Sequence, residues 1–211
     1  MIRIAVTTVA LTLVQTLAAA GQDLKLLGGG ALVFGFEGGD TEQELSGYLE
    51  AERFGFYGGA LGLVSTDIDQ KRVDLYGGYR AETATGFSYD LSYTRSYYPN
   101  DGGNCCGEIA LALGQTVGEA LNLSGELTYQ PEASLAGIEV GAEYFVTERL
   151  ALSANLGTFE QDTGSSATEW DVGVKYGLNE ASDLNLRYYD QPDTDGRIEL
   201  SLTFETSLLG R

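Results

Sequence analysis

Apolar and polar residues alternate at every second position through most of this chain. The stretch 121–130, LNLSGELTYQ, shows the pattern, with apolar or small residues at odd positions and polar residues at even ones. Because successive side chains of a β-strand point to opposite faces, this stretch predicts a strand with one apolar and one polar face. The same pattern recurs along nearly the whole chain, so the sequence predicts an all-β fold.

The alternating segments are separated by connections of hairpin length, and no linker or change in composition divides them. They therefore predict one domain of about twelve antiparallel strands. The predicted strands are 25–36, 42–53, 54–65, 70–81, 86–98, 107–116, 119–130, 135–146, 149–158, 168–178, 182–190 and 196–207.

The connections fall into two classes that alternate along the chain. Those after even-numbered strands are tight, as at Arg53-Phe54 and Val117-Gly118, whereas those after odd-numbered strands are mostly longer, as at 37–40, 99–106 and 161–167. Short periplasmic turns and longer outside loops are typical of outer-membrane barrels. The sequence thus predicts a transmembrane antiparallel up-and-down β-barrel with an even number of strands and both ends in the periplasm.

The two faces of the predicted strands differ in charge. One face carries only uncharged residues such as Leu91, Leu111, Val140 and Leu186, and we assign it to the lipid, where an arginine or lysine at midplane costs about 2–4 kcal/mol. In a soluble sandwich or lipocalin-type barrel the apolar face would instead point inward, but twelve strands enclose too wide a space for side chains to fill. The charged face supplies the candidate pore-lining residues Glu50, Arg72, Asp74, Arg80, Asp90, Glu126, Glu139, Glu143, Asp171, Lys175, Arg187 and Glu199.

Several aromatic residues lie near the ends of the predicted strands. Tyr48, Tyr57, Trp170 and Tyr188 are examples. Aromatic girdles at both membrane interfaces are typical of transmembrane barrels. We therefore predict that these rings belong to such girdles, although tyrosine is also a common residue in strands of any kind.

The N-terminus has the pattern of a secretory signal peptide. Arg3 precedes an apolar stretch that ends at Leu17, and three alanines at 18–20 offer a cleavage site. The alternative is a membrane anchor, but the stretch is shorter than the ~20 residues of a spanning helix and is interrupted by polar residues. We predict a signal peptide over residues 1–20 and a barrel domain over residues 21–211.

The charge and the missing histidine exclude several classes of function. The chain has 31 acidic and 12 basic residues, a net charge of −19 and no histidine. So acidic a chain would repel nucleic acid, which is bound through lysine and arginine. Histidine is the commonest general base, nucleophile partner and metal ligand. We therefore predict no enzyme activity, no catalytic residue, no metal site and no cofactor.

The only two cysteines, Cys105 and Cys106, are adjacent and fall in the longest predicted outer loop. In an oxidising compartment they could form a disulfide that staples the loop, or the pair is incidental. Two neighbouring thiols without histidine make a poor metal site.

Three stretches resemble the TorF-type porins, a family of Gram-negative outer-membrane proteins. The first joins SGYLE (46–50) to FYGG (56–59) and VDLYGGY (73–79). The second is FSYDLSY (87–93) followed by YYP (97–99), and the third is CGEI (106–109). The resemblance covers residues 42–115; it implies a twelve-stranded outer-membrane barrel that acts as a pore, and it brings no catalytic residues.

We therefore expect a porin-like channel in the outer membrane that lets small polar solutes diffuse passively. The predicted lumen face carries eight acids and four bases, so we expect a preference for cations, because acidic rings select for them. The expected partners are outer-membrane lipid and small polar solutes or ions. The alternative is a non-conducting structural or adhesive barrel that acts through its outer loops.

Overall fold

The computed structural model describes residues 24–66, 71–101, 103–161, 164–190 and 196–209. The predicted signal peptide lies outside the described residues, so it stays a prediction. No helix in the described part of the chain is long and apolar enough to cross a membrane.

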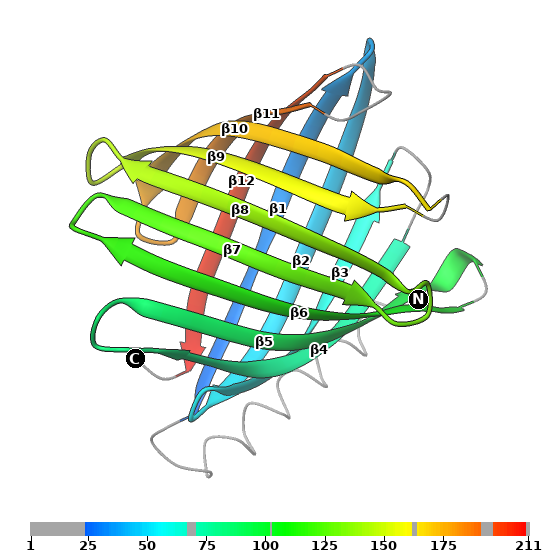
Figure 1. The fold of residues 1–211 in the computed structure, drawn as a ribbon, viewed down its shortest axis with the longest axis horizontal. Helices are drawn as coiled ribbons and strands as arrows, with labels where there is room; N and C mark the ends of the chain where they lie inside the picture. The colour runs from blue at the N-terminus through cyan, green and yellow to red at the C-terminus, as the bar shows by residue number, and fades with distance from the viewer. Residues whose placement is uncertain (1–23, 67–70, 102, 162–163, 191–195, 210–211) are drawn as a thin grey trace.

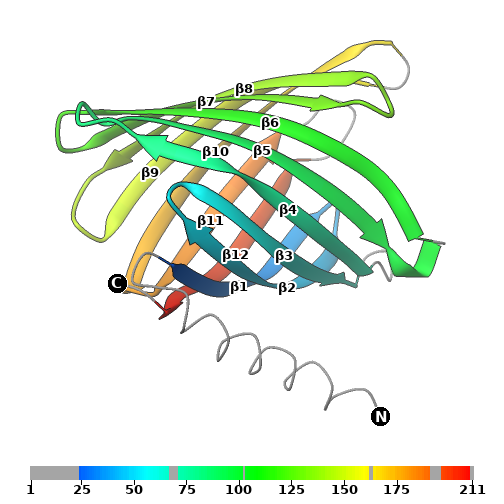
Figure 2. The ribbon, with the colours of Figure 1, turned by 90° about the horizontal axis from the view of Figure 1, so that it is seen from below.

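The described residues form a closed antiparallel barrel in which each strand pairs with its sequence neighbours and β1 pairs with β12. Figures 1 and 2 show the tilted strands, with β5–β8 on one side of the barrel and β11, β12, β1 and β2 on the other. The strands are β1 (Lys25–Glu37), β2 (Asp40–Arg53), β3 (Phe56–Ser65), β4 (Lys71–Glu82), β5 (Phe87–Tyr98), β6 (Gly103–Val117), β7 (Leu121–Gln130), β8 (Leu135–Phe145), β9 (Leu150–Glu160), β10 (Ser166–Asn179), β11 (Ser182–Asp190) and β12 (Arg197–Leu209).

The all-β fold and the strand number predicted from the alternation are confirmed. The predicted and observed strands agree within a few residues, and the pairing register keeps the faces aligned. For example, Leu111 pairs with Leu91 of β5 and with Leu127 of β7, so three apolar residues share one face. The period of two in the sequence therefore specifies both the strands and their register.

The apolar face of the strands is the outer surface of the barrel. Leu91, Val140 and Leu186 are about half exposed there, at 50–52 %. Soluble monomeric proteins rarely expose a large contiguous apolar surface, and such a surface marks a binding or membrane-facing region. This observation supports the predicted assignment of the apolar face to lipid.

Two predictions about the connections are wrong. The β1–β2 connection, expected among the longer loops, is a two-residue turn in which Gly38 and Gly39 both adopt positive φ, at 56° and 98°. Glycine takes this conformation without steric cost, so two residues are enough to connect the two strands. In addition, Cys105 and Cys106 lie within β6 and not in a loop, because β6 begins at Gly103, after a single 3₁₀ turn (Pro99–Asp101).

Candidate functional site

The inner face of the barrel carries the charged residues. All twelve predicted pore-lining residues lie in strands, at positions that alternate with the exposed apolar residues. They face the concave side, where side chains can reach across a whole strand. Arg80 of β4, for instance, pairs with Glu50 of β2, on the far side of β3.

The predicted basic residues of the inner face are all held in ion pairs. Arg80 pairs with Glu50, and Arg187 pairs with Asp171. The other two pairs are Arg72 Nε–Asp74 Oδ2 at 3.1 Å and Lys175 Nζ–Glu143 Oε1 at 2.5 Å.

Burial explains why these ion pairs are needed. Glu50, Asp74 and Asp171 are only 7–8 % exposed. A carboxylate withdrawn from water is costly unless it is paired and hydrogen-bonded. Asp171 also accepts hydrogen bonds from Asn155 Nδ2 at 3.0 and 3.1 Å, in addition to its arginine.

Four acids on β5–β8 form a second group, which we call the acidic wall: Asp90, Glu108, Glu126 and Glu139. None of the ion pairs between described residues involves them. No lysine or arginine lies between Arg95 and Arg149 in the sequence. On the inner face of β5–β8, only Glu143 has a basic partner among the described ion pairs, Lys175 of β10, and the four acids of the acidic wall have none.

The register brings three acids of the acidic wall into one row. Asp90 lies opposite Ala112, Ala112 opposite Glu126, and Glu126 directly opposite Glu139. Neighbouring strands are about 4.8 Å apart, so these residues form one lateral row across four strands. Glu126 interacts electrostatically with the other three acids of the wall. Like charges directly opposite each other are destabilising in a sheet, so this row has a cost that the fold tolerates.

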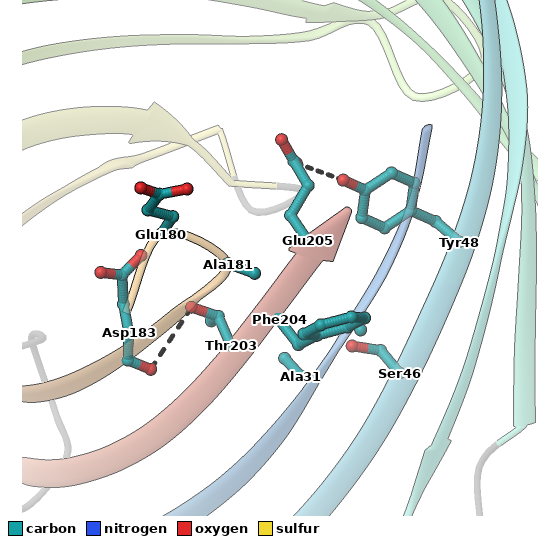
Figure 3. A pocket seen from close by; sticks show the side chains of 10 residues that line it. Ala31, Ser46, Tyr48, Glu180, Ala181, Asp183, Thr203, Phe204 and Glu205 are labelled. Atoms are coloured by element: carbon teal, nitrogen blue, oxygen red, sulfur yellow. Dashed lines mark hydrogen bonds between the residues drawn. The ribbon is translucent and has the colours of Figure 1, made fainter. Parts of the chain in front are cut away.

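An acidic pocket lies at the end of the barrel that carries the connections after even-numbered strands. Its volume is about 460 Å³, and Glu180, Asp183 and Glu205 line it together with Tyr48. Figure 3 shows that the Tyr48 hydroxyl points to Glu205, and that Thr203 bonds the main-chain oxygen of Asp183. The described residues that line this pocket include no lysine or arginine.

The sequence did not reveal several residues of the inner face. Lys25 pairs with Glu52 at 3.2 Å, and Arg197 pairs with Glu42 at 2.9 Å and Glu199 at 3.3 Å. Strict alternation within β2 would have found Glu42 and Glu52, because both have the parity of Glu50. Lys25 and Arg197 lie at strand ends, where the apolar pattern is too short to define a face.

The prediction that Tyr48 and Tyr57 belong to aromatic girdles is wrong. Both point inward: Tyr48 bonds Glu205 of β12, and the Tyr57 hydroxyl donates to Asp90 Oδ1 at 2.6 Å. By contrast, Trp170 is exposed on the outer face, and its ring lies 5.6 Å from that of Tyr188. That pair fits a girdle.

The described residues contain no group of three or more histidine, cysteine, aspartate or glutamate residues arranged to hold a metal ion. Cys106 is disulfide-bonded. The side chain of Cys105 lies outside the described residues, so the pairing of these two residues stays a prediction.

Known proteins share the fold of this chain without sharing its sequence. No protein-family model matches the chain, and no curated protein does. A KdgM porin is similar in structure, with a TM-score of 0.68 and 9 % identity over 83 % of this chain and 98 % of the porin. A NanC porin has a TM-score of 0.63 and 11 % identity over the same shares. An outer membrane phospholipase A from Escherichia coli has a TM-score of 0.54 and 10 % identity over 86 % and 90 %.

At these identities the likeness establishes the fold and not the activity. The chain has the twelve-stranded barrel of outer-membrane porin-like proteins. This fold, together with the apolar outer face, supports the predicted location in the outer membrane. The more specific resemblance to TorF-type porins stays a prediction. Because a phospholipase shares the fold, the choice between channel and enzyme depends on the residues of the inner face.

Proposed function

We propose that this protein is an outer-membrane channel for passive diffusion of small polar solutes, with a preference for cations. The observation that carries the proposal is the acidic wall, whose four carboxylates have no lysine or arginine partner among the described ion pairs. Acidic groups along a channel attract cations and repel anions. The acidic pocket at one end of the barrel adds charge of the same sign.

The missing histidine favours transport over catalysis. Acyl transfer by a barrel enzyme needs a nucleophile and an activating base, and the chain has no histidine to act as that base. The candidate pore-lining residues are therefore proposed to act by charge and not by covalent chemistry.

The decisive experiment is the reversal potential of single channels in planar bilayers under a KCl gradient. We expect a K⁺/Cl⁻ permeability ratio above one at a salt concentration of about 0.1 M, where the Debye length is about 10 Å. The double variant Glu126→Gln, Glu139→Gln should lower the ratio by about two- to fourfold, since a unit charge about 10 Å away contributes about 0.4 kcal/mol in water.

A matched control removes the same charge elsewhere. Glu119 and Glu148 are exposed residues of the connections after β6 and β8, so Glu119→Gln, Glu148→Gln should change the ratio much less. An equal effect of both double variants, or an anion-selective wild type, contradicts the proposed preference.

The alternative is a closed structural barrel that acts through its outer loops. It is favoured by the side chains that cross the inner face, such as Arg80 reaching Glu50 and Glu52 over β3. The same bilayers distinguish the two functions, because a closed barrel inserts and gives no conductance steps.

A further inference from the structure

Arg80 and Asp90 lie directly opposite each other on β4 and β5. Residues of opposite charge in this position normally attract each other across the strands. The Arg80 guanidinium nevertheless turns the other way, to Glu50 and to Glu52, whose Oε2 lies 3.2 Å from Arg80 Nε. Arg80 therefore forms ion pairs with two acids of β2 and forms none with Asp90, the acid directly opposite it.

Tyr57 of β3 separates the two charges. The Arg80 Cζ lies 4.0 Å from the centre of the Tyr57 ring, within the range of a cation–π interaction. The hydroxyl of the same ring donates to Asp90 Oδ1 at 2.6 Å. One face of Tyr57 thus holds the guanidinium, while its hydroxyl holds the carboxylate.

Gly78 of β4 makes room for this arrangement. It pairs with Tyr57 across the strands, and a Cβ at Gly78 would lie only 2.7 Å from the Tyr57 Oη. The ring can therefore lie over β4 and reach Asp90 on β5.

We propose that Tyr57 contributes to the charge selectivity of the channel by keeping Arg80 away from Asp90. This inference rests on the proposed function and goes one step further. A phenol hydrogen bond leaves the charge of Asp90 in place, whereas an arginine ion pair would neutralise it. Tyr57 carries no charge at neutral pH, yet its position leaves Asp90, the first residue of the acidic wall, uncompensated.

The test measures the K⁺/Cl⁻ permeability ratio of Tyr57 variants in planar bilayers. Tyr57→Ala removes the ring and the hydroxyl, so Arg80 can turn to Asp90. The acidic wall then loses one charge while Glu50 and Glu52 lose their partner, so the ratio should fall by at most about twofold, the effect of one nearby charge. Tyr57→Leu fills more of the space and should give the same fall, which keeps the test available if the alanine variant does not fold. Tyr57→Phe keeps the ring that holds Arg80 and should stay near the wild type.

Two double variants separate this role from a general loosening of the barrel. In an Asp90→Asn background, Tyr57→Ala should have no further effect, because position 90 then carries no charge with which Arg80 can pair. In an Arg80→Gln background, Tyr57→Ala should likewise not lower the ratio. A structural effect of losing the ring would persist in both backgrounds.

The outcomes keep this inference apart from the proposed function. A wild type without cation preference defeats both. A cation-preferring wild type whose ratio is unchanged in Tyr57→Ala and Tyr57→Leu overturns the role of Tyr57 and leaves the proposed function standing. A fall in ratio that persists in the Arg80→Gln background also overturns it.

Discussion

Tyr48 of β2 donates a hydrogen bond to Glu205 of β12, across the inner face of β1. The contact links the second strand to the last one, over the seam at which the barrel closes. It therefore adds a side-chain connection to the backbone ladders that join β1 to its two neighbours.

We expect Tyr48→Phe to lower the free energy of unfolding by about 1 kcal/mol, the usual net value of one hydrogen bond. The measurement is urea unfolding of the refolded barrel in lipid, followed by tryptophan fluorescence. Tyr144→Phe is the matched control, because Tyr144 is exposed on the outer face. Equal midpoints for the two variants would show that the contact contributes nothing to closure.

Gly29 of β1 lies beneath the Tyr48 ring. A Cβ at this position would lie 2.5 Å from the Phe204 carbonyl oxygen and 2.6 Å from Tyr48 Cε1. We expect Gly29→Val to destabilise the barrel by about 1–3 kcal/mol through overpacking, detected as a lower temperature of the heat-dependent shift in gel mobility. Gly62→Val should leave this temperature unchanged or raise it, since no atom lies within 4 Å of a Cβ there. The reverse order would contradict the packing argument.

The assignment of the two faces predicts opposite responses to one substitution at neighbouring positions. Leu127 is 48 % exposed on the outer face, and Thr128 follows it on the inner face. Leu127→Arg should cost about 2–4 kcal/mol in a bilayer, whereas Thr128→Arg should cost less and should lower the cation preference. Folding yields and unfolding midpoints in lipid vesicles test the first part. An arginine tolerated at Leu127 would contradict the lipid-facing assignment.

The connection between β7 and β8 (131–134) is fastened to the barrel by Glu132. Its Oε2 accepts a hydrogen bond from the Gly107 N–H at 3.0 Å, and its other oxygen pairs with Arg95. The Gly107 main-chain hydrogen bond, assisted by Arg95, lowers the pKa of Glu132 below its ordinary value of 4.5. A carboxyl with a lowered pKa contributes its stabilisation above the ordinary pKa and loses it as the pH falls through the lowered value.

We therefore expect this connection to stay fastened at neutral pH and to loosen only at a pH below 4.5. The chemical shift of the Gly107 amide proton should titrate with a midpoint below that value. Glu132→Gln should abolish the titration, whereas Glu148→Gln, in another connection, should leave it intact. A Gly107 midpoint at or above the ordinary value would contradict the hydrogen bond.

The sequence predicted the strands, their number and the faces of most of them, because apolar and polar residues alternate strictly. Leu127 and Glu126 show why. Because one neighbour is apolar and the other is charged, only one of them can face the lipid. In β3 the pattern FYGGALGLVS has apolar or small residues at both parities. Which residues of β3 face inward is set by its pairing with β2 and β4, and the sequence of β3 alone does not show that pairing.

Parity predicted most charged residues of the face opposite the apolar one, but not how they are arranged. Asp90 and Arg80 were both found from their parity, yet nothing local indicates that Arg80 turns to β2. The direction in which Arg80 turns depends on Tyr57 and on the space that Gly78 leaves. Tyr57 is uncharged, so the pattern of charged residues in the sequence does not single it out. The division into paired acids and an unpaired acidic wall also emerges only when the strands are placed side by side.

The absence of lysine and arginine from β6–β8 has a practical consequence for proteolysis. Trypsin cleaves after these two residues, so a complete digest of the unfolded chain leaves the segment 96–149 as a single peptide. This peptide carries Glu108, Glu126 and Glu139, three of the four carboxylates of the acidic wall. If a water-soluble carbodiimide and a small amine are applied to the folded barrel, the fragment-ion spectrum of this one peptide will report which of these carboxylates the reagent reached, apart from the other acids of the segment.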